Sequence, residues 1–386
     1  MPSKRRIAIL GATGSIGQNA LRVIRAHSDQ LELVAAAGGS RIAPLAAIAQ
    51  EFQLRQVGVF EPPIPPGELH GSFPAQTQVV TGMQGLIEIA THPDVDMVLI
   101  AVVGTTALLP CIEAIRAKKD IALASKEILV MAGEFIMPMV REHGVQLLPT
   151  DSEHNAIFQC LRDEPLRTVE KVLLTASGGR YLNTPVEQLA SIPAEEAVLH
   201  PNWSMGQKIS IDSSTMANKG LEVIEARWLF GLQPEQIEVV IHPQSIVHSM
   251  VQFRDGSLIA QLSPPNMSFA IQHCLLYPER ACGIDATLDF SQCLTLEFQP
   301  PDQDRFPCLR LAFDALRLGH TAPAIFNAAN EIAVSAFVEK RIGFLDIPRV
   351  IEFTLENLPI LKPANIETII ETDQEARRIS HQWTVS

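Results

Sequence analysis

The N-terminal residues constrain the fold of this chain most narrowly. A short apolar run at residues 7–10 leads directly into the stretch G-A-T-G-S-I-G at 11–17, which a helical pattern at 18–26 and a strand-like run at 31–37 follow. Strand, glycine-rich turn, helix and strand within about thirty residues are typical of a dinucleotide-binding unit. The glycines let the backbone approach a pyrophosphate, and the helix N-terminus offers free N–H groups. Without that context, the glycine spacing would indicate only a tight strand-to-helix turn.

The residues after the second strand bear on which dinucleotide binds. NAD sites commonly place an acidic residue there, but this chain has Gly38-Gly39-Ser40-Arg41. Arg41 can pair with a 2′-phosphate and Ser40 can donate to it, which favours NADP. The competing interpretation makes Arg41 a solvated residue in the first turn of the next helix.

The alternation of strands and helices continues to about residue 150. Strand-like runs lie at 57–60, 78–80, 97–103, 121–124 and 146–149. This order predicts a doubly wound (Rossmann-like) parallel sheet, in which ligands lie beyond the carboxyl ends of the strands. Gly104, Lys126 and Asp151 fall at such ends, so we expect Lys126 to contact a substrate, although a solvated lysine is the alternative.

Three interpretations remain open for Asp151-Ser152-Glu153. Asp151 could cap the helix that follows. Asp151 and Glu153 could be a general acid and base, or they could bind a hard divalent cation, which prefers carboxylate oxygens.

Beyond residue 150 the pattern changes. Strands at 172–175, 236–241, 246–253 and 257–262, with a hairpin signal at Asp255-Gly256, predict an α+β region whose sheet is partly antiparallel. One face of such a sheet can pack on a second copy, so we expect a homodimer. Helical periodicity dominates at 309–318, 322–340, 348–358 and 366–381.

We therefore divide the chain into four segments: a dinucleotide-binding domain at 1–150, an α+β domain with the suspected dimer interface at 151–277, a linker at 278–306 and a helical bundle at 307–386. The polar run N-A-A-N-E at 327–331 either faces the active site or fixes a helix contact.

The segment 200–222 carries the densest set of polar groups. It reads H-P-N-W-S-M-G-Q-K-I-S-I-D-S-S-T-M-A-N-K-G-L-E. Lysine supplies charge, and serine and asparagine supply directed donors, as a phosphate requires.

Charge and composition limit which classes of partner and which cellular compartment fit this chain. The formal net charge of −13 disfavours nucleic acid or an acidic membrane as partner, because both need a basic face. No apolar run reaches the length of a membrane span. Six scattered cysteines without a C-x-x-C pair indicate a reducing compartment, so we expect a cytoplasmic protein.

Several blocks together resemble one family. G-A-T-G-S-I-G, A-S-K-E, D-S-E-H-N-A-I-F-Q, S-G-G, the 200–222 segment, H-P-Q-S-I-V-H-S-M-V and N-A-A-N-E are similar, in order, to signature blocks of the 1-deoxy-D-xylulose 5-phosphate reductoisomerases. The resemblance implies NADPH- and metal-dependent rearrangement and reduction of that phosphorylated sugar to 2-C-methyl-D-erythritol 4-phosphate, an isoprenoid precursor. It implies Mg²⁺ or Mn²⁺, with Co²⁺ as a further candidate. It also implies that residues 1–150 form an NADPH-binding domain and that 151–277 form a catalytic and dimerisation domain with an active-site flap.

The resemblance also assigns residues. For the metal it implies Asp151, Glu153 and Glu222, against a purely capping Asp151. Catalytic roles fall to Lys126, Glu153 and His200. The implied substrate contacts are Ser152, Ser177, His200, Ser213, Asn218, Lys219 and, in a flap, Trp203 and Met205. The implied cofactor contacts are Thr13, Gly14, Ser15, Ile16, Gly39, Ser40, Arg41, Lys126, Glu127 and Gly206.

Two departures from the family pattern stand out. Ser125 replaces a frequent asparagine, and the family often has a lysine near Ser40, which leaves Arg41 as the main candidate for the 2′-phosphate. An alternative function is an NADP-dependent dehydrogenase of another phosphorylated sugar, which would not need three carboxylates. A non-enzymatic NADP sensor would need neither those carboxylates nor the polar segment.

Overall fold

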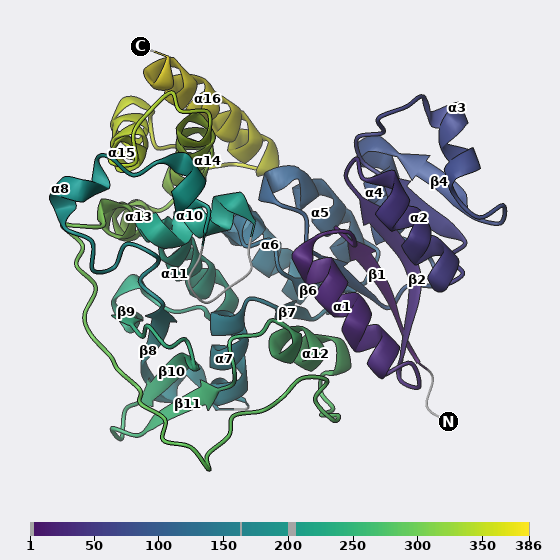
Figure 1. The fold of residues 1–386 in the computed structure, drawn as a ribbon, viewed down its shortest axis with the longest axis horizontal. Coiled ribbons are helices and arrows are strands. Elements are labelled where there is room, and N and C mark those ends of the chain that lie inside the picture. Colours follow the sequence, from purple (N-terminus) through teal and green to yellow (C-terminus); the bar gives the residue numbers. More distant parts are fainter. Residues whose placement is uncertain (1–3, 163, 200–205, 386) are drawn as a thin grey trace. The chain divides into compact units, whose positions relative to one another are not determined.

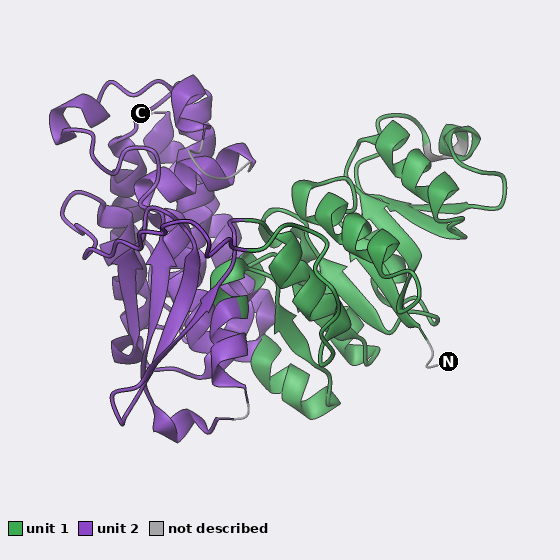
Figure 2. Cartoon of the chain, turned by 60° about the horizontal axis from the view of Figure 1, so that its bottom comes forward, with its two compact units in different colours: residues 1–128, 136–155, 266–287 green, residues 129–135, 156–265, 288–386 purple. Residues whose placement is uncertain are grey.

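The structure is a computed structural model that describes residues 4–162, 164–199 and 206–385. The chain forms two compact units (Figure 2). Unit 1 comprises Met1–Ile128, Ile136–Asn155 and Asn266–Thr287, and unit 2 comprises Leu129–Phe135, Ala156–Pro265 and Leu288–Ser386.

Unit 1 is built on a parallel sheet of seven strands in the order β4-β3-β2-β1-β5-β6-β7 (Figure 1). The strands are β1 (Arg5–Leu10), β2 (Leu31–Gly38), β3 (Gln56–Val59), β4 (Gln78–Thr81), β5 (Met97–Ile100), β6 (Asp120–Leu123) and β7 (Leu147–Pro149). β1 and β5 are continuous apolar runs because helices cover both faces of the sheet. The predicted doubly wound sheet is thus confirmed, and its order reverses between β1 and β5, where such folds place a dinucleotide.

Helices connect these strands. They are α1 (Ser15–Ala26), α2 (Ile42–Glu51), α3 (Pro66–Leu69), α4 (Gly82–Ala90) and α5 (Leu108–Arg116), with 3₁₀ turns η1 (His70–Ser72) and η2 (Gly104–Ala107). α6 (Glu127–His143) and α7 (Ser152–Leu161) contribute residues to both units. β5 ends three residues before the predicted boundary at 103, because the chain turns there into η2, where Gly104 has φ +74°.

A later segment, Asn266–Thr287, also belongs to unit 1 and contains α12 (Ser268–Leu276). Asn155 anchors it: its Nδ2 donates to the Pro149 carbonyl at 3.0 Å and lies 3.3 Å from Cys274 Sγ. The Cys274 thiol itself donates to the Pro149 carbonyl at 3.0 Å. The chain therefore returns to the first sheet after it has built the second.

Unit 2 holds a four-stranded mixed sheet in the order β11-β10-β8-β9 (Figure 1). The strands are β8 (Val169–Ala176), β9 (Ile237–Ile241), β10 (Val247–Phe253) and β11 (Leu258–Leu262). β8 and β9 are parallel, and the other two pairs are antiparallel. The predicted hairpin at Asp255-Gly256 joins β10 to β11, and Gly256 has φ +88°.

Apart from α16, the remaining helices of unit 2 contribute buried apolar residues to one hydrophobic core that they share with this sheet, and Ala376 of α16 packs with Ile325 and Ala328 in a second cluster. Val172 of β8, Ile224 of α11, Phe326 of α14 and Ile351 of α15 all belong to it. The helices are α8 (Val186–Leu189), α9 (Ala194–Ala197), α10 (Gln207–Thr215), α11 (Ala217–Phe230), α13 (Pro307–Leu318), α14 (Ala322–Val338), α15 (Asp346–Asn357) and α16 (Ile366–Thr384), with turns η3 (Leu166–Thr168) and η4 (Pro234–Gln236). These two units divide the chain differently from the expected boundaries at 150, 277 and 306.

Candidate active site

The glycine-rich turn joins β1 to α1 at the reversal point of the first sheet. The amides of Gly11 and Ala12 both donate to the Ala37 carbonyl, at 2.9 and 2.8 Å. Gly11 has φ +93°, and a Cβ there would lie 2.3 Å from the Ala101 carbonyl oxygen, so only glycine fits. Gly14 caps α1 without a side chain, and Ser15 and Ile16 form its first turn. The N–H groups of that turn are available to a pyrophosphate.

Arg41 lies against this turn. Its Nη2 donates to the Thr13 carbonyl at 2.6 Å and lies 3.2 Å from Thr13 Oγ1. Gly39 and Ser40, just after β2, are exposed. The guanidinium therefore lies beside the glycine turn, while Arg41 remains an exposed residue at the N-cap of α2.

Lys126 and Asp151 meet beyond the carboxyl ends of β6 and β7. The Lys126 ammonium forms an ion pair with Asp151 Oδ2, and both side chains are largely shielded from water. Glu127, the next residue, is buried in the first turn of α6. Ser125 Oγ donates to the Val102 carbonyl at 2.5 Å and so ties the loop after β6 to the loop after β5. The replacement of the family's asparagine by Ser125 thus has a structural role.

Asp151 and Glu153 form a carboxylate pair at the start of α7. Their oxygens lie within 4.8 Å of each other, and Ser152 Oγ donates to Glu153 Oε2 at 2.6 Å. Asp151 also takes the capping position, since its carbonyl accepts from the Asn155 amide at 2.8 Å. The carboxylate itself points toward Lys126, and two carboxylates this close suit a hard cation.

A second glycine turn, Ser177-Gly178-Gly179, follows β8 in unit 2. Gly179 has φ +69°, and a Cβ there would lie 2.6 Å from the Ser213 carbonyl oxygen. This close approach packs the turn against the end of α10, so Ser177 and Ser213 come from neighbouring backbone segments. Both serines are half-buried.

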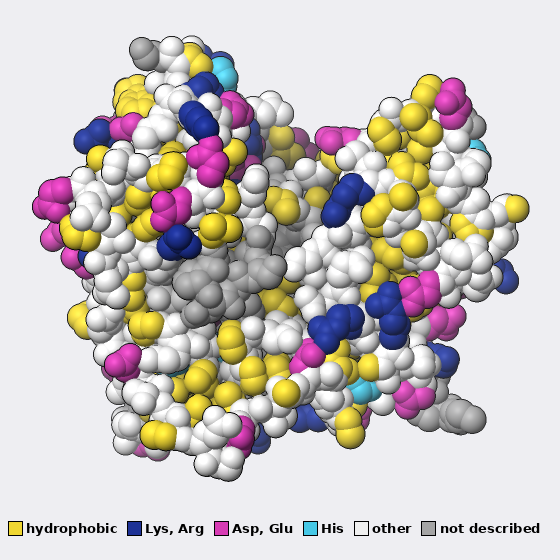
Figure 3. All heavy atoms as spheres, viewed as in Figure 1, with side chains coloured by type: hydrophobic (Ala, Val, Ile, Leu, Met, Phe, Trp, Pro, Cys, Tyr) yellow, Lys and Arg dark blue, Asp and Glu magenta, His cyan; other side chains and the backbone are white. Residues whose placement is uncertain are grey.

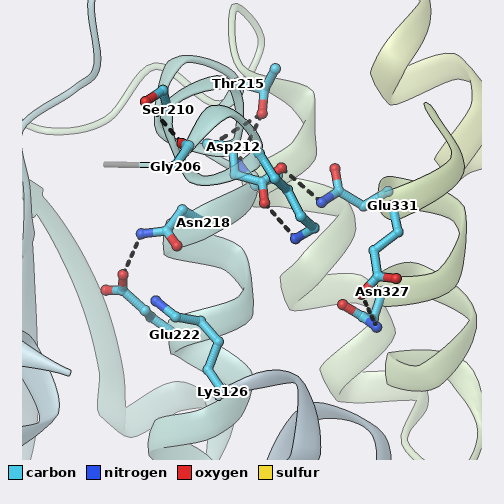
Figure 4. Close-up of polar contacts among 12 residues, drawn as sticks. Lys126, Gly206, Ser210, Asp212, Thr215, Asn218, Glu222, Asn327 and Glu331 are labelled. Atoms are coloured by element: carbon cyan, nitrogen blue, oxygen red, sulfur yellow. Dashed lines mark hydrogen bonds and ion pairs between the residues drawn. The ribbon is translucent and has the colours of Figure 1, made fainter. Parts of the chain in front are cut away.

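The first turns of α11 carry Asn218, Lys219 and Glu222. Lys219 and Glu222 form a buried ion pair, 4% and 1% exposed, and Asn218 Nδ2 donates to Glu222 Oε1 at 2.5 Å (Figure 4). Met216, at φ +63°, forms the bend between α10 and α11. A lysine ammonium has three donors, so the bond to Glu222 is compatible with a contact to a phosphate oxygen.

The overall surface charge does not favour binding of an anion. On the face in Figure 3, basic side chains lie scattered among acidic and apolar ones, and the chain carries a net charge of −13. An anionic ligand would therefore need a local cluster of basic groups to bind. Among the described helices, none combines the length and apolarity that a membrane span requires.

Three predicted residues, His200, Trp203 and Met205, lie outside the described residues. Gly206 is described and caps the N-terminus of α10.

The sequence suggested no role for Asp212 and left two roles open for residues 327–331, a position facing the active site or a helix contact. Asn330 Nδ2 donates to Asp212 Oδ1 at 2.9 Å, so this run fixes a helix contact. The i, i+4 spacing of Lys208 and Asp212 was the available signal for their ion pair.

Family models match most of the chain. Residues 7–133 match 1-deoxy-D-xylulose 5-phosphate reductoisomerase, residues 147–230 match its C-terminal domain, and residues 262–379 match the DXP reductoisomerase C-terminal domain. Proteins of that name are 49% identical to this chain in Geobacillus sp. (strain WCH70), over 96% of this chain and 98% of the relative, and in Chlorobium chlorochromatii (strain CaD3), over 97% and 98%.

Solved structures of reductoisomerases are also similar to this chain over nearly its whole length. The Zymomonas mobilis reductoisomerase in complex with NADPH is 39% identical, with a TM-score of 0.93 over 100% of both chains. A DOX-P reductoisomerase in complex with NADPH, fosmidomycin and magnesium is 42% identical, with a TM-score of 0.94 over 99% of this chain and 98% of that one.

Buried histidines make the stability of the chain depend on pH. His248 in β10 has Nε2 3.2 Å from the Ser263 carbonyl oxygen, and burial lowers the pKa of His248 from 6.5 to about 4. Burial likewise lowers the pKa of His273 in α12 to about 4. A lowered folded pKa means that the unfolded chain binds the proton first as pH falls. The stabilising contribution is therefore complete above pH 6.5 and is lost as pH falls toward 4.

We expect the free energy of unfolding in urea to decline from pH 7 to about 4.5, and His248→Gln to make that decline shallower by up to about 1.4 kcal/mol per pH unit, one proton's worth. His70→Gln, at an exposed position, controls for the substitution. An identical slope in wild type and His248→Gln would contradict the assignment.

Proposed function

This chain belongs to the 1-deoxy-D-xylulose 5-phosphate reductoisomerase family, and we infer that it converts that sugar to 2-C-methyl-D-erythritol 4-phosphate with NADPH and a divalent cation. It is an NADP-dependent oxidoreductase and isomerase of isoprenoid precursor synthesis. The observation that carries this conclusion is similarity over nearly the whole chain to a solved relative in complex with NADPH, fosmidomycin and magnesium. A dehydrogenase without rearrangement is not favoured.

We propose that NADPH lies on the glycine turn of unit 1. The residues that would hold it are Thr13, Gly14, Ser15, Ile16, Gly39, Ser40, Arg41, Lys126, Glu127 and Gly206. Support comes from the first-turn N–H groups of α1, which no side chain caps, and from Arg41, whose Nη2 donates to the Thr13 carbonyl. Bound there, NADPH supplies the hydride that reduces the rearranged aldehyde.

The cation fits the carboxylates of Asp151, Glu153 and Glu222. All three offer hard oxygen ligands, and lysines compensate two of them, since Lys126 pairs with Asp151 and Lys219 with Glu222. Mg²⁺ or Mn²⁺ suits such oxygens best, and Co²⁺ is a further candidate. When bound, the cation supplies Lewis-acid stabilisation of negative charge on the substrate's oxygens.

The phosphate of the substrate fits the second unit. Ser177, Ser213 and Asn218 supply directed donors and Lys219 supplies the charge, and the close packing of the Ser177 turn on Ser213 holds two of these donors together. Anchoring the phosphate leaves the carbon end free to rearrange, so that binding energy from the remote group can be used at the reacting carbons.

At the reacting end, Lys126 and Ser152 would contact the substrate's oxygens. The Lys126 ammonium can hold a proton beside the carbonyl oxygen, and Ser152 orients Glu153 through the 2.6 Å hydrogen bond. His200, Trp203 and Met205 would cover the substrate and exclude water, a role that rests on the family resemblance alone.

The domain roles follow the same assignment. We propose that residues 1–150 bind NADPH, that 151–277 carry the catalytic groups, that 278–306 link the parts and that 307–386 support the substrate site. All six cysteines are free thiols, which supports a cytoplasmic location.

We also propose a homodimer through unit 2. β11 is an edge strand with Leu258 and Ile259 about half exposed, and the extended stretch 288–299 exposes Phe290 at 74%. This stretch is anchored at its end, where His242 stacks on Phe298 with ring centroids 4.7 Å apart. An edge strand and a fixed apolar stretch are surfaces that a second copy can cover.

The function is tested by NADPH oxidation with 1-deoxy-D-xylulose 5-phosphate, with and without chelator. We expect turnover that needs Mg²⁺ or Mn²⁺, and a loss of at least about a hundredfold in Glu222→Gln with NADPH binding unchanged, because a neutral amide is a poor cation ligand. Glu238→Gln, which removes a surface ion pair with Lys171, is the matched control. Turnover indifferent to chelator would refute the function; equal loss of NADPH binding in Glu222→Gln would make Glu222 structural.

Arg41 sets the choice of cofactor. Arg41→Met should raise KM for NADPH about tenfold or more and leave KM for NADH nearly unchanged, since only NADPH carries the 2′-phosphate. Arg25→Met, which removes a surface pair with Glu51, should change neither constant. A parallel rise for both cofactors would show instead that Arg41 acts by holding Thr13.

The dimer is tested by sedimentation equilibrium at micromolar protein concentration. Wild type should sediment at twice the chain mass, and Ile259→Asp should shift the distribution toward single chains, because a charge cannot be buried unpaired at the interface. Leu318→Asp, on the exposed side of α13, should leave the mass unchanged. A monomeric wild type, or a dimer unaffected by Ile259→Asp, would rule out this surface.

A further inference from the structure

α10 packs in unit 2 through an unusually polar face. Ser210, Asp212, Ser214 and Thr215 are at most 4% exposed, and Ile211 is the buried apolar residue among them. Apolar contacts tolerate sliding and rotation because hydrophobic attraction has no direction. Hydrogen bonds do have direction. Ser210 and Thr215 donate within α10 and its cap, whereas Asp212 accepts from another helix, so the Asp212 bond bears on where α10 lies.

Asp212 makes the strongest of these bonds. Its Oδ2 accepts from Lys208 Nζ at 2.7 Å, and its Oδ1 accepts from Asn330 Nδ2 at 2.9 Å (Figure 4). Asp212 is 1% exposed, and an ionised carboxylate at such a site needs both charge compensation and hydrogen bonds. Lys208 supplies the charge from within α10, and Asn330 supplies the external anchor.

Asn330 comes from the long helix α14 and is fully buried. Within the part of the chain that the structure describes, its Oδ1 has no hydrogen-bond partner, so the amide is committed to Asp212 through its donor. One turn earlier, Asn327 donates to Glu331 at 3.2 Å, and Glu331 pairs with Arg377 of α16 at 2.7 Å. Asn330, which bonds α10 through Asp212, therefore lies on α14, and the Glu331–Arg377 ion pair joins α14 to α16.

The position of α10 matters at its C-terminal end. Ser213 directly follows Asp212, and its carbonyl approaches Gly179 of the Ser177 turn. That carbonyl also accepts from the Met216 amide at 3.3 Å, in the bend that starts α11. Asn218 and Lys219 follow within one turn. A shift of α10 would thus displace the proposed phosphate donors relative to one another.

We propose that Asp212 is a positioning residue for the substrate's phosphate: held by Lys208 and Asn330, it fixes α10 so that Ser213, the Ser177 turn and Lys219 keep one geometry. This role rests on the phosphate site of the proposed function. It makes the C-terminal helices part of the substrate site, through a residue that contacts no substrate.

The test compares Asp212→Asn with a matched lesion elsewhere. In Asp212→Asn the Lys208 ammonium loses its carboxylate, and KM for 1-deoxy-D-xylulose 5-phosphate should rise at least about tenfold, with kcat within about threefold and KM for NADPH unchanged. Asp314→Asn removes the ion pairs that Asp314 makes within α13 with Arg310, at i, i+4 and 3.5 Å, and with Arg317, at 3.2 Å. It should leave all three constants near wild type.

A milder variant keeps the proposal testable if Asp212→Asn folds poorly. Asn330→Ala keeps the ion pair and removes only the anchor, so it should raise the same KM about threefold or more. The double variant should be no worse than Asp212→Asn alone, because both act through one contact. Unchanged KM in both single variants, or an equal rise in Asp314→Asn, would overturn the proposal.

Inorganic phosphate separates this proposal from the proposed function. Its dissociation constant, measured by titration calorimetry on full-length protein, should rise in Asp212→Asn and Asn330→Ala and stay the same in Asp314→Asn. If wild type binds phosphate but does not turn over the sugar, the function fails while the variant comparison still decides the role of Asp212. Equal phosphate binding in all variants would refute that role.

Discussion

Ion pairing of shielded carboxylates with lysines is the interaction on which the candidate active site depends. Lys126 pairs with Asp151, Lys208 with Asp212 and Lys219 with Glu222, and each carboxylate is at most 15% exposed. A shielded charge without a partner would cost several kcal/mol or would be neutralised by a shift in its pKa. Pairing lets the chain keep ionised carboxylates and ammonium groups inside it, where their fields are screened less than in water.

In the proposed function, two of these pairs contain a metal ligand and the third does not. Asp151 and Glu222 carry the charge that a divalent cation needs, and Lys126 and Lys219 supply positive charge beside them. Asp212 instead directs both oxygens at the protein, to Lys208 and Asn330. The same ion pairing thus accompanies the two proposed metal ligands, Asp151 and Glu222, and the proposed anchor, Asp212, which differ in what surrounds each carboxylate.

Much of the fold and of the site could be predicted from local sequence. The apolar runs of β1, β5 and β6 mark strands covered on both faces, and the glycines at 11–17 mark the turn that only glycine can form beside Ala101. Lys126, Asp151 and Arg41 were expected near ligands because they follow strands of a parallel sheet. The structure confirms that these residues lie at strand ends, with Lys126 paired to Asp151 and Arg41 bonded to Thr13.

The sequence by itself determined the alternating elements, the two glycine turns and the family, because periodicity, turn chemistry and motif spacing act between near neighbours. Only the tertiary structure decided that α12 returns to the first unit through Asn155, and that α13, α14 and α15 share one core with the β8–β11 sheet. It alone joined Asn330 to Asp212, 118 residues apart. Such a contact has no periodic signature: a single amide and a single carboxylate meet only when two helices pack, and that packing depends on the whole core.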